Sequence, residues 1–379
     1  MTPRWERALR RWVDAGVVDG VAADRIRVFE ADRSRKTGMR WPVILALAFG
    51  GLMLGAGVLL FVSAHWDRLS PASRLAVVLS MVALFHVGAA FVRDRFEVLG
   101  ITLHAVGTAA LGGGIFLTAQ IFNLQENWPS GIMLWALGAW LAWILMRDWP
   151  QLTMAAVLTP AWLVGEWTVK TEGVGLRADR VAILGIVLLA FSFLSARTRE
   201  SDSTYRRALV WVGGLALFPS IAFLLALRDR FKSVYYHGSH QPLSAQLLVL
   251  GWLAAILLPL VVAYFLRGRS SWANLLAVAW VFPLAFMLDP IWNLFIYFWC
   301  AVGSVGLVAW GLREAQKSRI NLGVIGFALT VLFFYFSSVM DKFGRSVSLI
   351  GLGVLFLAGG LALERTRRHL VARIAEVKP

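Results

Sequence analysis

Long apolar stretches alternate with short polar turns along most of this chain. The longest polar interval after Pro42, from Arg228 to Pro242, is only fifteen residues. A helix rises about 1.5 Å per residue, so most of the apolar stretches can cross the hydrocarbon core of a bilayer. The pattern predicts about twelve transmembrane helices. They are expected at residues 42–64, 74–92, 99–122, 130–146, 150–168, 180–196, 206–227, 243–266, 271–288, 291–312, 319–338 and 344–363.

Residues 1–41 form the only sizeable polar segment and have a different pattern. Apolar residues such as Leu9 and Trp12 recur at helical spacing among arginines. Gly16 interrupts this pattern, and Asp19 is placed to cap a second helix. We expect a short amphipathic helical hairpin on the cytoplasmic face, whose role is either surface anchoring or binding of a partner.

Composition supports a membrane protein: 59% of the residues are hydrophobic, 16% are charged, and the mean hydropathy is +0.69. The net charge of +15 comes from basic residues at helix ends, which set topology and meet lipid headgroups rather than nucleic acid. Most of the 37 Lys and Arg residues lie in the N-terminal segment, alternate loops and the C-terminal tail. We therefore predict an all-α polytopic bundle at 42–368, with the hairpin at 1–41, a tail at 369–379 and both termini cytoplasmic.

The third predicted helix contains polar side chains at membrane depth. His104, Thr108 and Gln120 lie within it, and Glu126 follows its far end. Such groups usually face a bundle interior or a cavity, so we expect a cavity or ligand-binding site here. The alternative is that His104 bonds a neighbouring helix and Glu126 lies in water. The glycine triplet at 112–114 indicates close helix packing.

Two further positions are candidates for the same kind of site. His65 and Asp67 occupy a predicted outer turn, although an interfacial anchor explains them equally, because Ser70 is placed to cap the next helix. Glu166 is an acidic residue near the end of an apolar segment, where its charge is costly unless it reaches the interface.

Motifs of common enzyme classes do not occur in the sequence. We find no GxSxG elbow, HExxH helix or Walker loop, and the pair His237 and His240 has no neighbouring carboxylate or cysteine. Cys300 is the only cysteine, which excludes an internal disulfide. We predict no catalytic residue, no metal ligand and no cofactor.

Three stretches together resemble a known family. They are LRRWVDAGVVDGVAADRI near the N-terminus, SAHWDRLSP at 63–71 and GTAALGGGIFLTAQIFNLQENWPSGIMLWALGAW at 107–140. The chain is similar over residues 5–145 to bacterial predicted membrane proteins catalogued as domain of unknown function twenty-one fifty-seven. Asn123 and Leu124 stand where members often carry a histidine, which weighs against metal or proton chemistry there. The resemblance implies a polytopic protein of the bacterial inner membrane and supplies no activity.

The polar third helix and the absence of long outer loops favour a carrier or permease for a small or lipidic solute. One alternative is a membrane scaffold or sensor that binds a partner through the N-terminal hairpin. A second is a membrane-embedded enzyme that acts on a lipid-linked substrate with His65, Asp67 and Glu126. The expected partners are the lipid bilayer and a small-molecule or lipid ligand; homo-oligomerisation stays open.

Overall fold

A computed structural model describes residues 4–37, 70–121, 127–172, 176–196, 203–234, 244–284 and 293–336, with isolated positions within 45–60 and 350–361. Helices dominate these ranges and no strand occurs in them, in agreement with the all-α prediction. The chain divides into two compact units, Met1–Leu158 and Thr159–Pro379.

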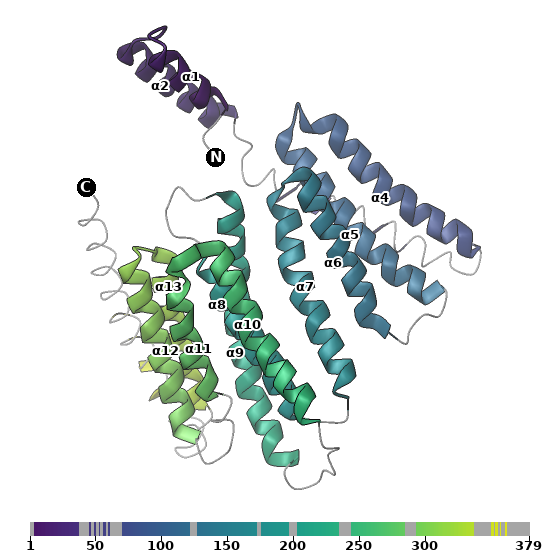
Figure 1. Cartoon of the computed structure of the whole chain (residues 1–379), viewed down its shortest axis with the longest axis vertical. Coiled ribbons are helices and arrows are strands. Elements are labelled where there is room, and N and C mark those ends of the chain that lie inside the picture. Colours follow the sequence, from purple (N-terminus) through teal and green to yellow (C-terminus); the bar gives the residue numbers. More distant parts are fainter. Residues whose placement is uncertain are drawn as a thin grey trace. The chain divides into compact units, whose positions relative to one another are not determined.

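Eight helical stretches in the described part are long and apolar enough to cross a membrane. The second to eleventh predicted segments correspond to helices α4 to α13 (Figure 1). The first and last predicted segments, 42–64 and 344–363, lie largely outside the described residues. The count of about twelve therefore stays a prediction, as do the boundaries at 41 and 368.

Two short helices, α1 (Arg4–Asp14) and α2 (Gly20–Thr37), begin the first unit. Gly16 has a φ of 69° in the turn between them, a value that glycine adopts without strain. The Asp19 carboxylate accepts a 2.6 Å hydrogen bond from the Ala22 amide and so caps α2, as its position predicted. The cytoplasmic placement of this segment stays a prediction.

The next helices of the first unit are α4 (Pro71–Arg93) and α5 (Glu97–Ile121), which pack side by side (Figure 1). Ser70 caps α4 by accepting a 3.2 Å hydrogen bond from the Ser73 amide, and Pro71 occupies the first helical position. The capping role predicted for Ser70 is therefore confirmed.

Small residues on α5 allow its neighbours to approach closely. A Cβ atom at Gly112 would lie 2.2 Å from the Trp135 ring of α6 (Trp128–Met146), and one at Gly114 would lie 2.4 Å from Val78 of α4. The glycine triplet thus serves helix packing, as the sequence indicated. Arg147 has a φ of 55° where α6 ends, and α7 (Trp149–Lys170) follows.

In the second unit, α8 (Leu176–Leu194) is the most enclosed helix of the described part. Its buried side chains include Leu184, Val187 and Leu194. It packs against α9 (Thr204–Val234), α10 (Ala245–Arg267) and α11 (Trp272–Leu284), and a 3₁₀ turn, η3 (Gly268–Ser271), joins the last two. These neighbours cover an apolar helix, and close van der Waals packing with them stabilises the unit.

The chain continues through α12 (Asn293–Arg313) and α13 (Lys317–Phe334), which pack side by side. Two tryptophans join α11 to α12: Trp280 Nε1 donates to the Trp299 carbonyl and Trp299 Nε1 donates to the Trp280 carbonyl, each at 2.9 Å. This reciprocal pair fixes the register of the two helices.

Replacement of Gly213 in α9 by alanine is expected to lower the free energy of unfolding by about 1–3 kcal/mol, because overpacking strains a filled interface. Its Cβ would lie 2.5 Å from the Ala190 carbonyl oxygen and 2.6 Å from the Leu194 nitrogen, both backbone atoms of α8. Denaturant titration in detergent measures the change. Gly88→Ala is the control: nothing lies within 4 Å of its Cβ, so we expect a gain of about 0.5–1 kcal/mol. Equal effects at the two positions would refute the close-contact explanation.

Candidate functional site

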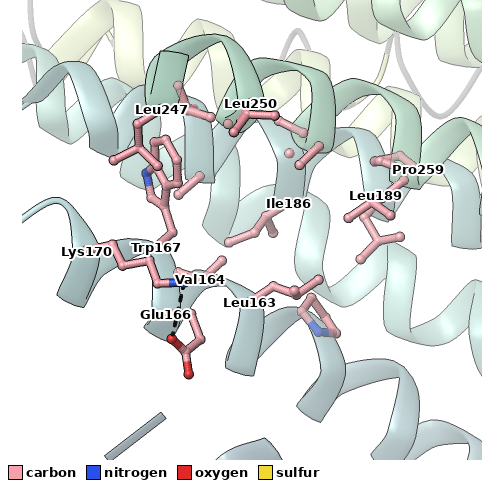
Figure 2. A pocket seen from close by; sticks show the side chains of 18 residues that line it. Leu163, Val164, Glu166, Trp167, Lys170, Ile186, Leu189, Leu247, Leu250 and Pro259 are labelled. Atoms are coloured by element: carbon pink, nitrogen blue, oxygen red, sulfur yellow. Dashed lines mark ion pairs between the residues drawn. The ribbon is translucent and has the colours of Figure 1, made fainter. Parts of the chain in front are cut away.

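Helices α7, α8 and α10 enclose an apolar groove of about 300 Å³ within the second unit (Figure 2). Its volume is at the lower end of the range of small-molecule sites, about 300–1,000 Å³. Aliphatic side chains from all three helices line it, including Val164, Ile186 and Leu250. The groove suits a narrow apolar group such as a hydrocarbon chain.

Trp167 forms one wall and is held by both neighbouring helices. Its Nε1 donates a 2.8 Å hydrogen bond to the Ala178 carbonyl in α8. A Cβ at Gly251 in α10 would lie 2.2 Å from the ring, so only glycine permits this approach. The α8–α10 contact is also close, since a Cβ at Gly185 would lie 3.2 Å from the Ala255 Cβ.

One end of the groove carries both signs of charge. Glu166 and Lys170 lie one turn apart on α7, with 4.0 Å between Nζ and Oε2 (Figure 2). Trp162 Nε1 donates to Glu166 Oε1 at 3.3 Å. The Glu166 side chain is 26% exposed and that of Lys170 is 66% exposed. Both groups can therefore meet the polar head of a molecule whose chain lies in the groove.

Towards Pro259 the groove has a different polar feature, which belongs to the backbone. Pro259 has no amide hydrogen for the carbonyl of Ala255, one turn earlier in α10, and both residues line the groove. The Ser192 hydroxyl lies 2.8 Å from the Pro259 carbonyl and links α8 to α10 at this level. The sequence signal for this feature was a proline inside an apolar segment.

Two of the polar residues predicted on the third helix, His104 and Thr108, lie in a cluster that also contains His86. His104 and Thr108 of α5 are buried, and His104 Nδ1 lies 3.0 Å from His86 Nδ1 of α4. Trp135 Nε1 donates to the Thr108 carbonyl at 2.8 Å. The cluster thus joins α4, α5 and α6. The contacts favour the alternative in which His104 bonds a neighbouring helix.

A second groove, of about 620 Å³, lies among α4, α5 and α6, and neither His104 nor Thr108 lines it. The backbone of Gln120 belongs to α5, but its side chain is not among those described. Glu126, His65 and Asp67 also lie outside the described residues, so their place in a cavity or ligand-binding site stays a prediction.

Sequence reasoning missed a cluster of arginines at the carboxyl end of α8. Arg319 donates to the carbonyls of Leu194 and Ser195, and Arg267 also donates to Ser195. Both guanidinium groups pair with the Glu314 carboxylate, in one case at 2.6 Å. Cations satisfy helix carbonyls and complement the helix dipole, so this cluster stabilises the carboxyl end of α8. The available signal was an arginine at the first position of a predicted apolar segment, 319–338.

The described residues contain no group of three or more His, Cys, Asp or Glu side chains that could hold a metal ion. The groove of α7, α8 and α10 offers a ligand an apolar lining, the Glu166 carboxylate and the Lys170 ammonium group, which are suited to binding.

Comparison with known proteins identifies a family for the N-terminal part of the chain. Residues 10–152 match the family described as "Predicted membrane protein (DUF2157)", which confirms the resemblance drawn from the sequence. No curated protein and no solved structure matches the chain. The match covers the first unit almost entirely, and the groove of α7, α8 and α10 lies beyond it.

Proposed function

We propose that this membrane protein is a carrier for a lipidic solute, which it binds in the groove of α7, α8 and α10. The observation that supports this most is the combination of a continuous apolar lining with a single acid–base pair at one end. An amphiphile has the matching form, a hydrocarbon chain with a polar head. Because the chain of a membrane lipid already lies in hydrocarbon, its retention in the groove depends on van der Waals packing and on the contacts of the head with Glu166 and Lys170.

The charges at the groove end favour a zwitterionic head. The Glu166 carboxylate can accept hydrogen bonds from an ammonium group, and Lys170 can donate to a phosphate. The 4.0 Å separation of Glu166 and Lys170 is at the limit of an ion pair, so little is lost when each turns to a ligand. Phosphatidylethanolamine has both groups and is the probe for the tests below.

Ala254→Phe is expected to lower the amount of bound phosphatidylethanolamine at least about tenfold, equivalent to a loss of about 1.4 kcal/mol. Ala254 is exposed and lines the groove, so a phenyl ring enters it without displacing a packed residue. Native mass spectrometry of the gently purified protein measures occupancy. Ala90→Phe, an exposed position on α4 outside the groove, is the matched control and retains wild-type occupancy. Wild-type occupancy in the Ala254 variant would refute binding in the groove.

Transport of the lipid between leaflets is tested separately from its binding. In proteoliposomes, the wild-type protein is expected to move a fluorescent phosphatidylethanolamine between leaflets. Glu166→Gln slows this about tenfold, because a hydrogen bond to a charged group is worth about 1.5–3 kcal/mol. Glu172→Gln, an exposed position two residues beyond α7, leaves the rate unchanged. Tight binding without any movement between leaflets would remove the carrier role and leave a lipid-binding role.

One observation favours a second function, recruitment of a partner by the N-terminal helices. Val17, Val21 and Phe29 are 74%, 64% and 65% exposed. A scaffold or sensor would use such apolar side chains to dock. Removal of residues 1–38 should then abolish function while lipid occupancy of the groove persists.

From the placement of basic residues and the family resemblance, we further propose that the protein lies in a bacterial inner membrane with both termini in the cytoplasm.

A further inference from the structure

A different groove of the second unit, of about 760 Å³, lies between α11 and α12. Apolar side chains line its length, among them Leu276, Trp280 and Val302. Arg267, Arg313 and Glu314 line the end where α10 and α12 terminate. The groove is therefore apolar along its length and charged at one end.

The charged end carries an excess of positive charge. Arg267 and Arg319 share the single carboxylate of Glu314, and Arg313 lies beside it. Among the charged residues that line the groove, two are arginines, Arg267 and Arg313, and one is acidic, Glu314. The Arg267 side chain is 4% exposed, and its Nε has no hydrogen-bond partner in the described part of the chain. An oxygen of a bound ligand would satisfy this donor.

Arg313 is the accessible member of this group. It is exposed, and its guanidinium lies 5.1 Å from the ring centroid of Trp272, the first residue of α11. This cation–π contact holds the charge over the entrance of the groove from the α11 side. Ser270 of η3 adds a hydroxyl group to the same end.

We infer that this groove binds an anionic phospholipid, with the phosphate against Arg313 and Arg267 and one acyl chain along α11 and α12. Charge complementarity selects an anion, and the apolar lining selects one that carries a hydrocarbon chain. The connections α10–α11 and α12–α13, which meet here, are both predicted to be cytoplasmic. The cytoplasmic leaflet is the one that attracts basic clusters. The inference does not depend on the groove of α7, α8 and α10.

Two substitutions distinguish the contribution of the lipid head group from that of the acyl chain, and neither changes the buried Arg267 or Arg319. Arg313→Gln removes the accessible charge. Gly306→Leu fills the groove, because Gly306 lines it and nothing lies within 4 Å of its Cβ. Arg147→Gln is the matched control: this exposed arginine at the end of α6 also lies over a tryptophan, Trp143, at 4.8 Å.

Binding of phosphatidylglycerol and phosphatidylcholine of equal chain length is measured by native mass spectrometry on the full-length protein. We expect the wild-type protein and the Arg147→Gln variant to bind phosphatidylglycerol at least about fivefold more tightly than phosphatidylcholine. One basic residue near a membrane surface supplies a preference of this size. Arg313→Gln reduces the preference to below about twofold. Gly306→Leu weakens binding of both lipids at this site about tenfold.

Three results would overturn the inference. Equal affinity of the wild-type protein for the two lipids would remove the role of charge. Equal binding of water-soluble glycerol phosphate would show a free-anion site that needs no acyl chain. An equal effect of Arg147→Gln and Arg313→Gln would show a general surface effect.

Discussion

Glu314→Gln is expected to lower the free energy of unfolding by about 3–5 kcal/mol, among the largest effects of a single substitution in this protein. The side chains of Arg319 and Arg267 are 1% and 4% exposed, and Glu314 is their shared carboxylate. Removal of one partner from a buried ion pair leaves an uncompensated charge, which costs about this much. SDS titration of the purified protein measures the loss. The matched change at the exposed Glu172 should stay within about 0.5 kcal/mol. Equal stabilities of the two variants would contradict a structural role for the cluster.

The Glu314 carboxylate also makes the free energy of unfolding depend on pH. Burial by itself raises the pKa of Glu314, but hydrogen bonds from Arg267 and Arg319 outweigh it and hold the pKa below the ordinary value of 4.5. A group with a lowered folded pKa contributes stability above its ordinary pKa and loses it as the pH falls through the folded pKa. The stability difference between wild type and Glu314→Gln should therefore shrink between pH 7 and pH 3. A constant difference would show that the carboxylate charge is not responsible.

Arg93→Met in the first unit should lower the free energy of unfolding by about 3 kcal/mol at neutral pH. The stability of this variant should depend on pH in the opposite direction to the stability that Glu314 contributes. Arg93 donates to Asp148 Oδ1 at 2.7 Å and to the Met146 carbonyl at 3.3 Å, between α6 and α7. The Asp148 side chain is 5% exposed, and its Oδ2 has no hydrogen-bond partner among the described residues. Without Arg93 this carboxylate is buried without a cation.

Burial raises the pKa of Asp148 above its ordinary value of 3.8, although Arg93 acts in the other direction. Loss of Arg93 raises the pKa further, so the folded protein takes up a proton that the unfolded chain does not hold. Acidification from pH 8 to pH 5 should therefore restore part of the stability of the variant. Arg93→Met combined with Asp148→Asn should be the more stable protein at pH 8. A loss that is independent of pH and unrelieved in the double variant would refute this account.

The sequence predicted those features that depend on neighbouring residues. Apolar length located α4 to α13, and local capping rules identified Ser70 and Asp19. Glu166 drew attention as an acidic residue in an apolar segment, and Trp162, four residues earlier, proved to be its hydrogen-bond donor. These interactions span four residues or fewer, so helical periodicity is enough to find them.

Contacts between distant segments were beyond such reasoning. His104 was expected in a cavity or, alternatively, bonded to a neighbouring helix, and nothing in the sequence paired it with His86. The Arg267–Glu314 pair spans 47 residues, and the contact of Arg319 with Leu194 spans 125. The groove of α7, α8 and α10 depends on which helices meet, and the apolar pattern is compatible with many arrangements of the same helices.

Photo-crosslinking of a lipid probe tests the central claim, lipid binding in the groove of α7, α8 and α10, most directly. A phosphatidylethanolamine with a diazirine in its acyl chain would be irradiated with the protein in nanodiscs, and the labelled peptides would be mapped by mass spectrometry. We predict adducts concentrated on groove residues such as Leu250, Ala254 and Leu258, with their loss in Ala254→Phe. Adducts spread evenly over exposed apolar positions elsewhere, such as Phe91 and Leu145, would contradict the claim.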